Sequence, residues 1–296
     1  MDIVITYVNG NDPVWQSDYE KYTSVPAMQK RFRDWGTLRY LLRGVEKNMP
    51  YIRNVYLVVS HPSQVPEWAD TEHLKVVLHK DIIPEEFLPT FNSNTIEMHL
   101  HRIEGLDEEF IYFNDDCFPM GHSEPTDFFR NGKIVIGFNR HLLAPNMYKK
   151  ICRNSDRLAR RAAGKCGSCF FVRPQHICTP MLRSESAELY GKEQEEIRRT
   201  SACRVRNENN VTQYIFLNYL YFKGRVIPHR ISKRHFSVSV ASVDKLRDFL
   251  LNPTKSMVCI NDVKLPDGRY QEMRDVIHKA FETSLPDKSK YEKSGV

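Results

Sequence analysis

Apolar and polar positions along the first part of the chain alternate as expected for strands and helices. Residues 2–8 form an apolar run rich in β-branched side chains, and turn-forming residues follow it at 9–13, which predicts a buried strand that ends in a loop. From 34 to 47 the apolar residues recur at the i, i+3, i+4 and i+7 spacing of an amphipathic helix. Apolar runs at 54–60 and 74–78 predict two further strands. This order is typical of a βαβ unit.

A second set of patterns extends the same alternation. A helix is predicted over about 93–106, and the apolar residues 109–113 predict a strand that ends in Asn114, Asp115 and Asp116. Further helical patterns occupy 180–199, 210–222, 243–251 and 270–283. The alternation favours an α/β fold, Rossmann-like, with a mainly parallel sheet flanked by helices.

Basic residues gather in three segments, 31–43, 153–165 and 223–234, of a chain with a formal net charge of +6. This clustering favours an anionic ligand, with solvated basic helix faces as the alternative. No segment resembles a known nucleic-acid-binding module, so we expect no nucleic acid partner. The wider segment 140–165 has no clear period, and we expect a loop or a substrate-facing insertion there.

Length and hydropathy limit the class of protein further. With 296 residues and 41% hydrophobic content, the chain can bury a substantial core in one large domain or two small ones. No apolar stretch approaches the roughly 18 residues of a membrane span, and the first residues show no basic leader followed by an apolar run. We therefore expect a soluble, cytoplasmic protein.

Seven cysteines make an odd number, which argues against a complete disulfide framework and agrees with a reducing cytoplasm. Cys152, Cys166, Cys169 and Cys178 lie close together in sequence. Four thiolates can bind zinc, but these spacings match no standard pattern. Reduced structural thiols are the favoured interpretation, with a zinc site as the alternative.

Asp115 and Asp116 directly follow a predicted strand, so their side chains should emerge at the carboxyl edge of the sheet, where open α/β folds bind ligands. Two adjacent carboxylates can hold a divalent cation, Mg²⁺ or Mn²⁺, against a diphosphate. A turn without any ion is the alternative interpretation of the same residues.

The first predicted strand, like the strand at 109–113, ends in polar residues. The polar ends of these two strands could converge on one crevice. Arg39 and Arg43 lie one helical turn apart, and their guanidinium groups match phosphate geometry. An exposed, solvated pair is the alternative. The polar residues at the end of the first strand are Asn9, Asn11 and Asp12.

Histidines supply further candidates. Glu97, His101 and Glu104 follow the i, i+4, i+7 spacing on a face of the predicted helix away from its apolar stripe. This line could position an acceptor hydroxyl or form a salt-bridged surface. His176 stands alone in its local sequence, which does not distinguish a general base from a structural residue.

The ordered set of these segments resembles the Stealth family, which includes bacterial capsule phosphotransferases. Four blocks in the family's order carry the resemblance, which covers most of the chain. Trp35 and Thr37 depart from the family pattern, where Asn and Glu are expected, and Asn209 and Asn210 stand where the animal enzyme of the family is acidic. The blocks lie at 5–13, at 31–43 continuing through 64–68 and 88–116, at His176 with 205–208, and at 259–262 with 285–292.

The resemblance implies a single catalytic domain over 1–296, with a donor- and metal-binding half at 1–139 and an acceptor half at 140–296. It implies transfer of a hexose 1-phosphate, an N-acetylhexosamine 1-phosphate in our prediction, from a UDP-sugar to a saccharide hydroxyl. A phosphodiester would form and UMP would be released, in capsule or cell-surface polysaccharide synthesis. Peripheral association with capsule machinery at the inner membrane would suit this role.

The resemblance also implies roles for individual residues. Attack at phosphorus calls for in-line positioning, neutralisation of charge and deprotonation of the hydroxyl. His176 would be the base, and Asp116, assisted by Asp115, would hold the metal. Phosphate would be bound by Arg39, Arg43 and Arg206, and the nucleotide sugar by Asn9, Asn11 and Asp12.

Two other functions remain open at this point. A metal-dependent glycosyltransferase would use the same carboxylates but release UDP instead of UMP. A saccharide- or nucleotide-binding module without catalytic activity would release neither nucleotide.

Overall fold

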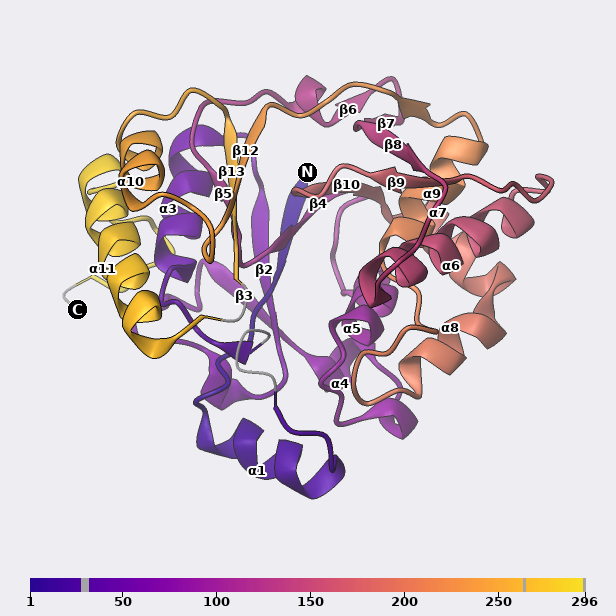
Figure 1. Ribbon diagram of the computed structural model, residues 1–296, viewed down its shortest axis with the longest axis horizontal. Helices are drawn as coiled ribbons and strands as arrows, with labels where there is room; N and C mark the ends of the chain where they lie inside the picture. Colours follow the sequence, from indigo (N-terminus) through magenta and orange to yellow (C-terminus); the bar gives the residue numbers. More distant parts are fainter. Residues whose placement is uncertain (28–31, 263–264, 295–296) are drawn as a thin grey trace.

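A five-stranded sheet forms the centre of the computed structural model, which describes residues 1–27, 32–262 and 265–294 (Figure 1). Its strand order is β10-β4-β1-β2-β3, and only the edge strand β10 runs antiparallel to its neighbour. The predicted α/β fold with a mainly parallel sheet is confirmed. The strands are β1 (Asp2–Thr6), β2 (Asn54–Val59), β3 (Leu74–Leu78), β4 (Glu109–Asn114) and β10 (Thr179–Leu182).

The strand order reverses at β1, because β2 pairs with one edge of β1 and β4 with the other. The register places Thr6, the last residue of β1, beside Asn114, the last residue of β4. Loops that leave two such strands in opposite directions open a crevice at the carboxyl ends of the strands. The sheet therefore creates a site where the sequence places Asp115 and Asp116.

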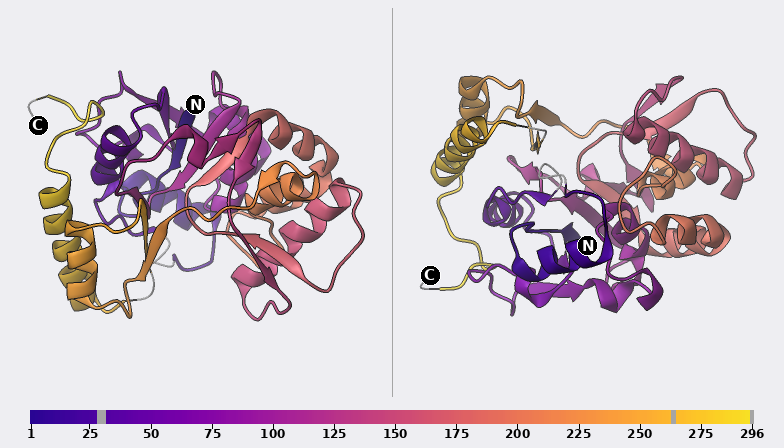
Figure 2. Two further views of the ribbon diagram at one scale, coloured as in Figure 1. Left: turned by 90° about the horizontal axis from the view of Figure 1, so that it is seen from above. Right: turned by 60° about the horizontal axis from the view of Figure 1, so that its bottom comes forward.

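Helices cover the sheet from both sides, which explains why its central strands are almost continuously apolar and buried. Figure 2 shows α3, α10 and α11 on one side and α5 to α9 on the other. The first group comprises α3 (Leu38–Asn48), α10 (Val243–Leu251) and α11 (Asp267–Ser284). The second comprises α5 (Ser93–His99), α6 (Met147–Ala162), α7 (Arg183–Lys192), α8 (Gln194–Ser201) and α9 (Tyr214–Phe222). Two further α-helices of the described residues are α1 (Pro13–Tyr22) and α4 (His79–Ile82).

Three small sheets connect these layers. One has the order β12-β13-β5, in which β13 runs antiparallel to β5, and its strands are β12 (Lys233–Ser237), β13 (Met257–Asn261) and β5 (Cys117–Pro119). A second pairs β8 (Phe138–His141) with β9 (Phe171–Pro174). The third contains β11 (Val226–Ile227), β7 (Lys133–Val135) and β6 (Phe129–Arg130). The first of these sheets brings the C-terminal part of the chain against the end of β4.

The sequence prediction for 140–165 is wrong, because α6 occupies most of this segment. Its buried face consists of Ile151, Cys152, Ser155, Asp156, Leu158 and Ala159. These positions recur at helical spacing, so the sequence did contain an amphipathic pattern, which the prediction missed among the many basic residues of the segment. Buried polar side chains here have partners: the Ser155 hydroxyl donates to the Ile151 carbonyl at 2.9 Å.

Two other predicted helices differ in extent. The helix predicted over 93–106 ends at His99 and continues as a short 3-10 helix, Leu100–Arg102. The segment predicted as one helix over 180–199 contains the edge strand β10, then α7 and α8. In both places the change of backbone turns side chains away from the faces that the α-helical period assigned to them.

Most buried apolar residues form one large cluster that extends from Ile3 in β1 to Tyr291 near the C-terminal end. Two small clusters lie apart from it, one around Trp15 and one around Phe171. Among the described residues, no helix combines the length and the apolar character that a membrane span requires.

Candidate active site

A cleft of about 310 Å³ opens at the carboxyl ends of β1 and β4. Its walls come from segments that lie far apart in sequence, because the loops after β1 and β4, the helices α5 and α6, and the strand β13 all meet here. The polar and aromatic side chains that line it include Tyr7, Arg33, Trp35, Glu97, Asp115, Asp116, Tyr148, His176, Arg206, Tyr214 and Asp262. The sequence analysis had assigned functions to five of these residues: Glu97, Asp115, Asp116, His176 and Arg206.

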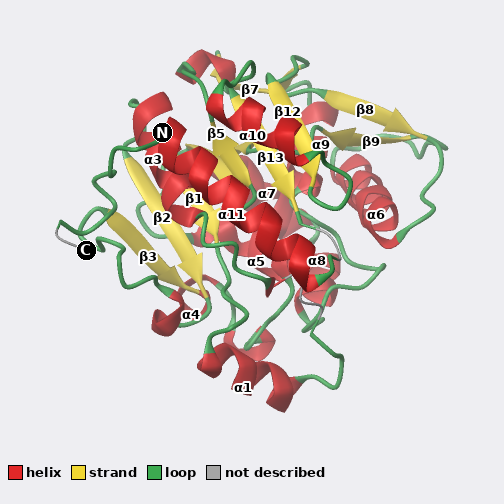
Figure 3. Ribbon diagram, turned by 60° about the vertical axis from the view of Figure 1, so that its left-hand side comes forward, coloured by secondary structure: helices red, strands yellow, loops and turns green. Residues whose placement is uncertain are grey.

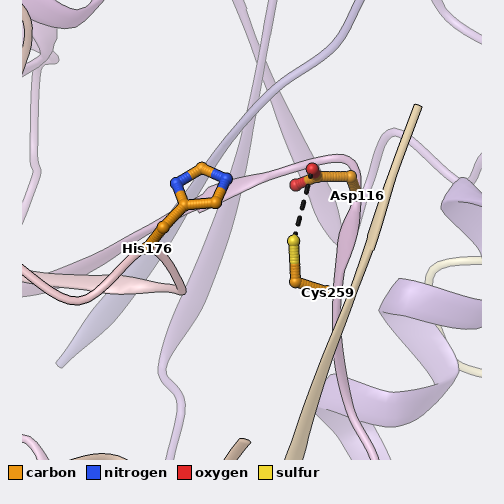
Figure 4. A group of neighbouring side chains, drawn as sticks. All are labelled: Asp116, His176 and Cys259. Carbon is orange, nitrogen blue, oxygen red and sulfur yellow. Dashed lines mark hydrogen bonds between the residues drawn. The ribbon is translucent and has the colours of Figure 1, made fainter. Parts of the chain in front are cut away.

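Asp116, His176 and Cys259 form the chemical centre of this region (Figure 4). One potential ligand atom of each lies within 4.8 Å of the other two. Asp116 sits in the turn between β4 and β5, and its backbone carbonyl accepts a hydrogen bond from the Ile260 amide at 2.8 Å. The register of β13 with β5 places Cys259 opposite Cys117. Strand pairing thus fixes the distance between Asp116 and Cys259.

Charges are strongly coupled within this group. Burial and the neighbouring Cys259 raise the pKa of Asp116 well above its usual range. The thiols of Cys117 and Cys259 donate to the two carboxylate oxygens of Asp116, at 3.3 and 3.5 Å. Burial lowers the pKa of His176, but the hydrogen bond to Cys259 and the charge of Asp116 outweigh burial and raise it. Protons in this centre are therefore shared among a carboxyl, an imidazole and a thiol.

A chain of hydrogen bonds orients the His176 ring through its Nδ1 atom. Nδ1 of His176 lies 3.0 Å from the Tyr214 hydroxyl, which lies 3.2 Å from the Tyr148 hydroxyl. Arg173 donates from Nη1 to the same Tyr148 hydroxyl at 3.1 Å. With Nδ1 engaged by Tyr214, the other ring nitrogen, Nε2, faces Asp116 (Figure 4). This arrangement fixes the ring orientation and directs Nε2 toward the carboxylate of Asp116.

Glu97 and Arg206 also line the cleft. Glu97 is buried, and its Oε2 accepts from the Thr212 hydroxyl at 2.7 Å and the Gln213 amide at 3.0 Å. Burial raises the pKa of Glu97, while Arg206 acts in the opposite direction. Arg206 donates a hydrogen bond to Ser93 at the start of α5. The sequence prediction placed both residues near substrate, and the structure places both in the cleft.

Asp115 lies among other carboxylates. Burial and the charge of Asp34 raise the pKa of Asp115 to about 7, and Asp262 adds to the effect. Oxygen ligands of this kind are what Mg²⁺ and Mn²⁺ prefer, so the chemistry of Asp115 and Asp116, which both line the cleft, fits such an ion. The thiol of Cys259 does not suit Mg²⁺, since thiolates select softer metals.

The structure does not bring Arg43 to the cleft, and its predicted contact with phosphate is wrong. Its guanidinium is buried in a bidentate ion pair with Glu292, with Nε and Nη2 at 2.8 and 2.7 Å from the two carboxylate oxygens. Nη1 donates to the Leu285 carbonyl at 2.9 Å. The helix face that carries Arg43 is covered by the C-terminal segment, which the local period could not reveal.

Arg39 and His101 also lie outside the cleft-lining set. The Arg39 guanidinium stacks over the ring of Trp68, 5.1 Å from its centroid. His101 falls in the 3-10 turn after α5, where its ring lies 5.1 Å from that of Tyr190. Burial lowers the pKa of His101 to about 3, so it is a neutral packing residue. The structure therefore does not support the predicted substrate contact of His101, and that of Arg39 stays a prediction.

The polar residues after β1 organise the loop instead of lining the cleft. Asp12 caps α1 by accepting from the Trp15 amide at 2.7 Å. Oδ1 of Asn9 accepts from the Asn11 amide at 2.9 Å. The two residues just before them, Tyr7 and Val8, do line the cleft. Direct contact of Asn9, Asn11 and Asp12 with a nucleotide sugar stays a prediction that the described cleft does not support.

Several cleft residues had no assigned role in the sequence analysis. Trp35, noted there as a departure from the family pattern, lines the cleft and donates from Nε1 to Asp262 at 3.0 Å. Tyr148 and Tyr214 come from helices α6 and α9. The only sequence signal for Cys259 and Asp262 was their position in the fourth family block.

The four cysteines considered for zinc do not gather into one site. Cys152 and Cys178 are buried, whereas Cys166 and Cys169 are exposed. In the described part of the chain, the one group of three or more potential metal ligands is Asp116, His176 and Cys259.

The chain is similar in sequence to several known proteins. Residues 31–136 match the family model of Stealth protein conserved region 2. The chain is 31% identical to the capsular polysaccharide phosphotransferase WcwK of Streptococcus pneumoniae, over 99% of both proteins. It is 34% identical to the receptor polysaccharide phosphotransferase WefC of Streptococcus oralis, again over 99% of both. A solved structure of the galactosyltransferase LgtC with donor and acceptor sugar analogues aligns with 93% of this chain and 95% of its own, at 11% identity and a TM-score of 0.40.

Proposed function

The chain belongs to the Stealth family of polysaccharide phosphotransferases, and from this premise we propose that it transfers a sugar phosphate in the synthesis of a capsular or other cell-surface polysaccharide. The donor in this proposal is a UDP-sugar, and the transferred group is a hexose 1-phosphate, specifically an N-acetylhexosamine 1-phosphate. A saccharide hydroxyl attacks the phosphorus, a phosphodiester forms and UMP leaves.

One observation carries the proposal: Asp116, His176 and Arg206 meet in one cleft although they come from three distant segments. The cleft lies at the switch point of a parallel sheet, where such folds bind nucleotides. A carboxylate, an imidazole and a guanidinium supply the three functions that phosphoryl transfer needs: neutralisation, proton removal and positioning.

His176 acts as the proton acceptor in this mechanism. Its Nδ1 hydrogen bond to Tyr214 orients the ring, so that Nε2 can take the proton from an acceptor hydroxyl as that hydroxyl approaches phosphorus. Arg206, with Arg33 in the facing wall, neutralises charge on the phosphate oxygens. Glu97, held by Thr212 and Gln213, orients Arg206 or accepts a hydrogen bond from a saccharide hydroxyl.

A divalent cation held by Asp115 and Asp116 would supply charge neutralisation for the diphosphate of the donor. The remaining roles fall to the chain itself. The donor half is assigned to 1–139 and the acceptor half to 140–296, and the proposed location is the cytoplasm, with peripheral association at the inner membrane near capsule machinery.

Nucleotide release tests the proposal directly. Incubation of the enzyme with a panel of UDP-sugars and a saccharide acceptor should release UMP, and His176→Ala should lower turnover by about 10²–10⁴-fold. Release of UDP would instead identify a glycosyltransferase, and release of neither nucleotide a binding module. Treatment with EDTA should abolish activity that Mg²⁺ or Mn²⁺ restores, and full activity after chelation would remove the cation from the proposal.

A further inference from the structure

Three basic side chains, those of His141, Lys149 and Arg173, meet at the start of α6, whose residue Tyr148 lines the cleft. Nζ of Lys149 lies 3.0 Å from Nδ1 of His141, and Nε of Arg173 lies 3.4 Å from Nε2 of the same ring. His141 ends β8 and Arg173 lies in the partner strand β9, so sheet pairing brings the two side chains together. Figure 3 shows β8 and β9 side by side at the edge of the molecule, next to α6.

No negative charge balances this cluster within the described residues. Neither Lys149 nor Arg173 takes part in an ion pair there. Burial and the charge of Arg173 lower the pKa of Lys149, and no carboxylate acts against them. The adjacent thiol of Cys152 is neutral, because burial raises its pKa to about 12. The charge of Arg173 therefore disfavours the charged form of Lys149, and an anion bound between the two side chains would offset that repulsion.

Hydrogen bonds connect the cluster to the reacting centre. Arg173 is joined to His176 through the hydroxyls of Tyr148 and Tyr214, in three consecutive hydrogen bonds. Tyr148 lines the cleft and is adjacent in sequence to Lys149. Lys233, whose Nζ donates to the His176 carbonyl, adds another positive group on this side. An anion at Lys149 and Arg173 would therefore lie near a saccharide whose hydroxyl approaches His176.

We propose that Lys149 and Arg173, supported by His141, form a subsite for a phosphate group that the acceptor carries. The inference rests on the proposed function and adds the substrate class of its acceptor side. Guanidinium and ammonium groups together match the shape and charge of phosphate oxygens. Two sources share this chemistry: a phosphodiester within the acceptor glycan, of the same type that the enzyme forms, and the phosphate of a lipid head group.

Direct binding measurements test the subsite without requiring transfer. The soluble probe is short-chain poly(glycerol phosphate), with an uncharged dextran of equal length as its control, titrated by isothermal calorimetry. Vesicles of phosphatidylglycerol and of phosphatidylcholine form the second arm. The wild-type protein should bind a phosphate-bearing probe and not its uncharged or zwitterionic counterpart. Binding to the soluble polymer assigns the glycan source, and binding only to phosphatidylglycerol vesicles assigns the lipid source.

Variants then locate the binding. K149Q/R173Q should weaken binding by about tenfold or more, whereas R173K, which keeps the charge, should stay within about threefold of wild type. The matched control K245Q/R247Q removes the same two charge types from the exposed face of α10 and should have no effect. Equal weakening in both double variants, or no binding of any phosphate probe, would overturn the subsite.

The outcome is separable from that of the proposed function. Wild-type protein that releases UMP but binds no phosphate probe rules out the subsite alone. Wild-type protein that releases no UMP rules out the phosphotransfer proposal, whatever the calorimetry shows. If the double variant unfolds in a thermal melt, K149Q alone carries the test, because Lys149 is exposed enough to be replaced without disturbing the core.

Discussion

Two arginine-centred regions of this protein use the same side chain in opposite ways. Arg43 is buried, and its donors go to both oxygens of Glu292 and to the Leu285 carbonyl. Burial would raise the pKa of Glu292, but Arg43 lowers it below its usual range. Among the described residues, Arg173 is hydrogen-bonded to the Tyr148 hydroxyl and the His141 ring and forms no ion pair with a carboxylate. An arginine such as Arg43, whose guanidinium nitrogens all donate to a carboxylate or a carbonyl, stabilises the fold. An arginine such as Arg173, which has no carboxylate partner among the described residues, can bind an anionic ligand.

The same contrast separates Asp116 from Glu292. Asp116 is a carboxylate whose ionisation is opposed by burial, and Glu292 is one whose ionisation a partner favours. Natural sites of function commonly retain such unfavourable groups, because the chemistry requires them. Substitution of Asp116 should therefore lower activity more than stability, and substitution of Glu292 should lower stability more than activity.

The largest effect is expected for Asp116→Asn. The variant removes the carboxylate that faces His176 and that would hold a cation, and UMP release should fall by about 10³-fold or more. The free energy of unfolding at pH 7, measured with urea, should stay equal or rise, because a costly buried charge is removed. A large loss of stability together with activity would show that Asp116 belongs with Glu292 and not with the cleft.

Glu292→Ala should show the reverse. Removal of one partner leaves the Arg43 charge buried and unpaired, which lowers the free energy of unfolding by about 3–5 kcal/mol. Turnover per folded molecule should remain within about threefold of wild type, since Glu292 lies outside the cleft. Glu72→Ala, at an exposed carboxylate, is the control and should be neutral. The double variant R43M/E292L should recover most of the lost stability.

Buried histidines outside the cleft should make stability depend on pH. Burial lowers the pKa of both His79 and His99 to about 4 from 6.5. Below pH 6.5 these histidines bind protons in the unfolded chain but stay neutral in the folded protein. The free energy of unfolding therefore decreases as the pH falls from 6.5 toward 4. Each histidine contributes about 1.4 kcal/mol per pH unit in this window.

Urea unfolding at pH 7, 6 and 5 measures this slope. His99→Gln should flatten it, whereas His122→Gln, at an exposed histidine, should leave it unchanged. Identical slopes in wild type and His99→Gln would contradict the assignment of the pH effect to buried histidines.

The smallest effect is expected for Tyr214→Phe, which removes the hydrogen-bond partner of His176 Nδ1. Turnover should fall by about tenfold with little change in KM, and the pH dependence of kcat should shift, because the imidazole loses the group that orients it. Tyr221→Phe, on the same helix but exposed, is the control. An unshifted pH profile with normal turnover would show that Tyr214 only fills space.

Much of the N-terminal half of the fold, residues 1–139, could be predicted from sequence. The apolar runs at β1 and β4 are strong because both strands are buried on two faces, and the position of Asp115 and Asp116 after β4 follows from the strand itself. Less of the C-terminal half, residues 140–296, was predicted correctly from sequence. The apolar residues of α6, such as Ile151 and Leu158, do recur at helical spacing, and the prediction missed this period because basic residues dominate the segment.

Sequence by itself therefore determined the alternation of strands and helices, the polar end of β4 and the membership of the Stealth family. These features depend on residues close together in the chain or on ordered blocks. Only the tertiary structure decided which charges are paired. Arg43 meets Glu292 from the far end of the chain. Asp116 lies beside Cys259 because β5 pairs with β13, and His176 joins them from the segment between β9 and β10. Local hydropathy indicates which face of an element is buried, but the partner that satisfies a buried charge is chosen by contacts between distant segments.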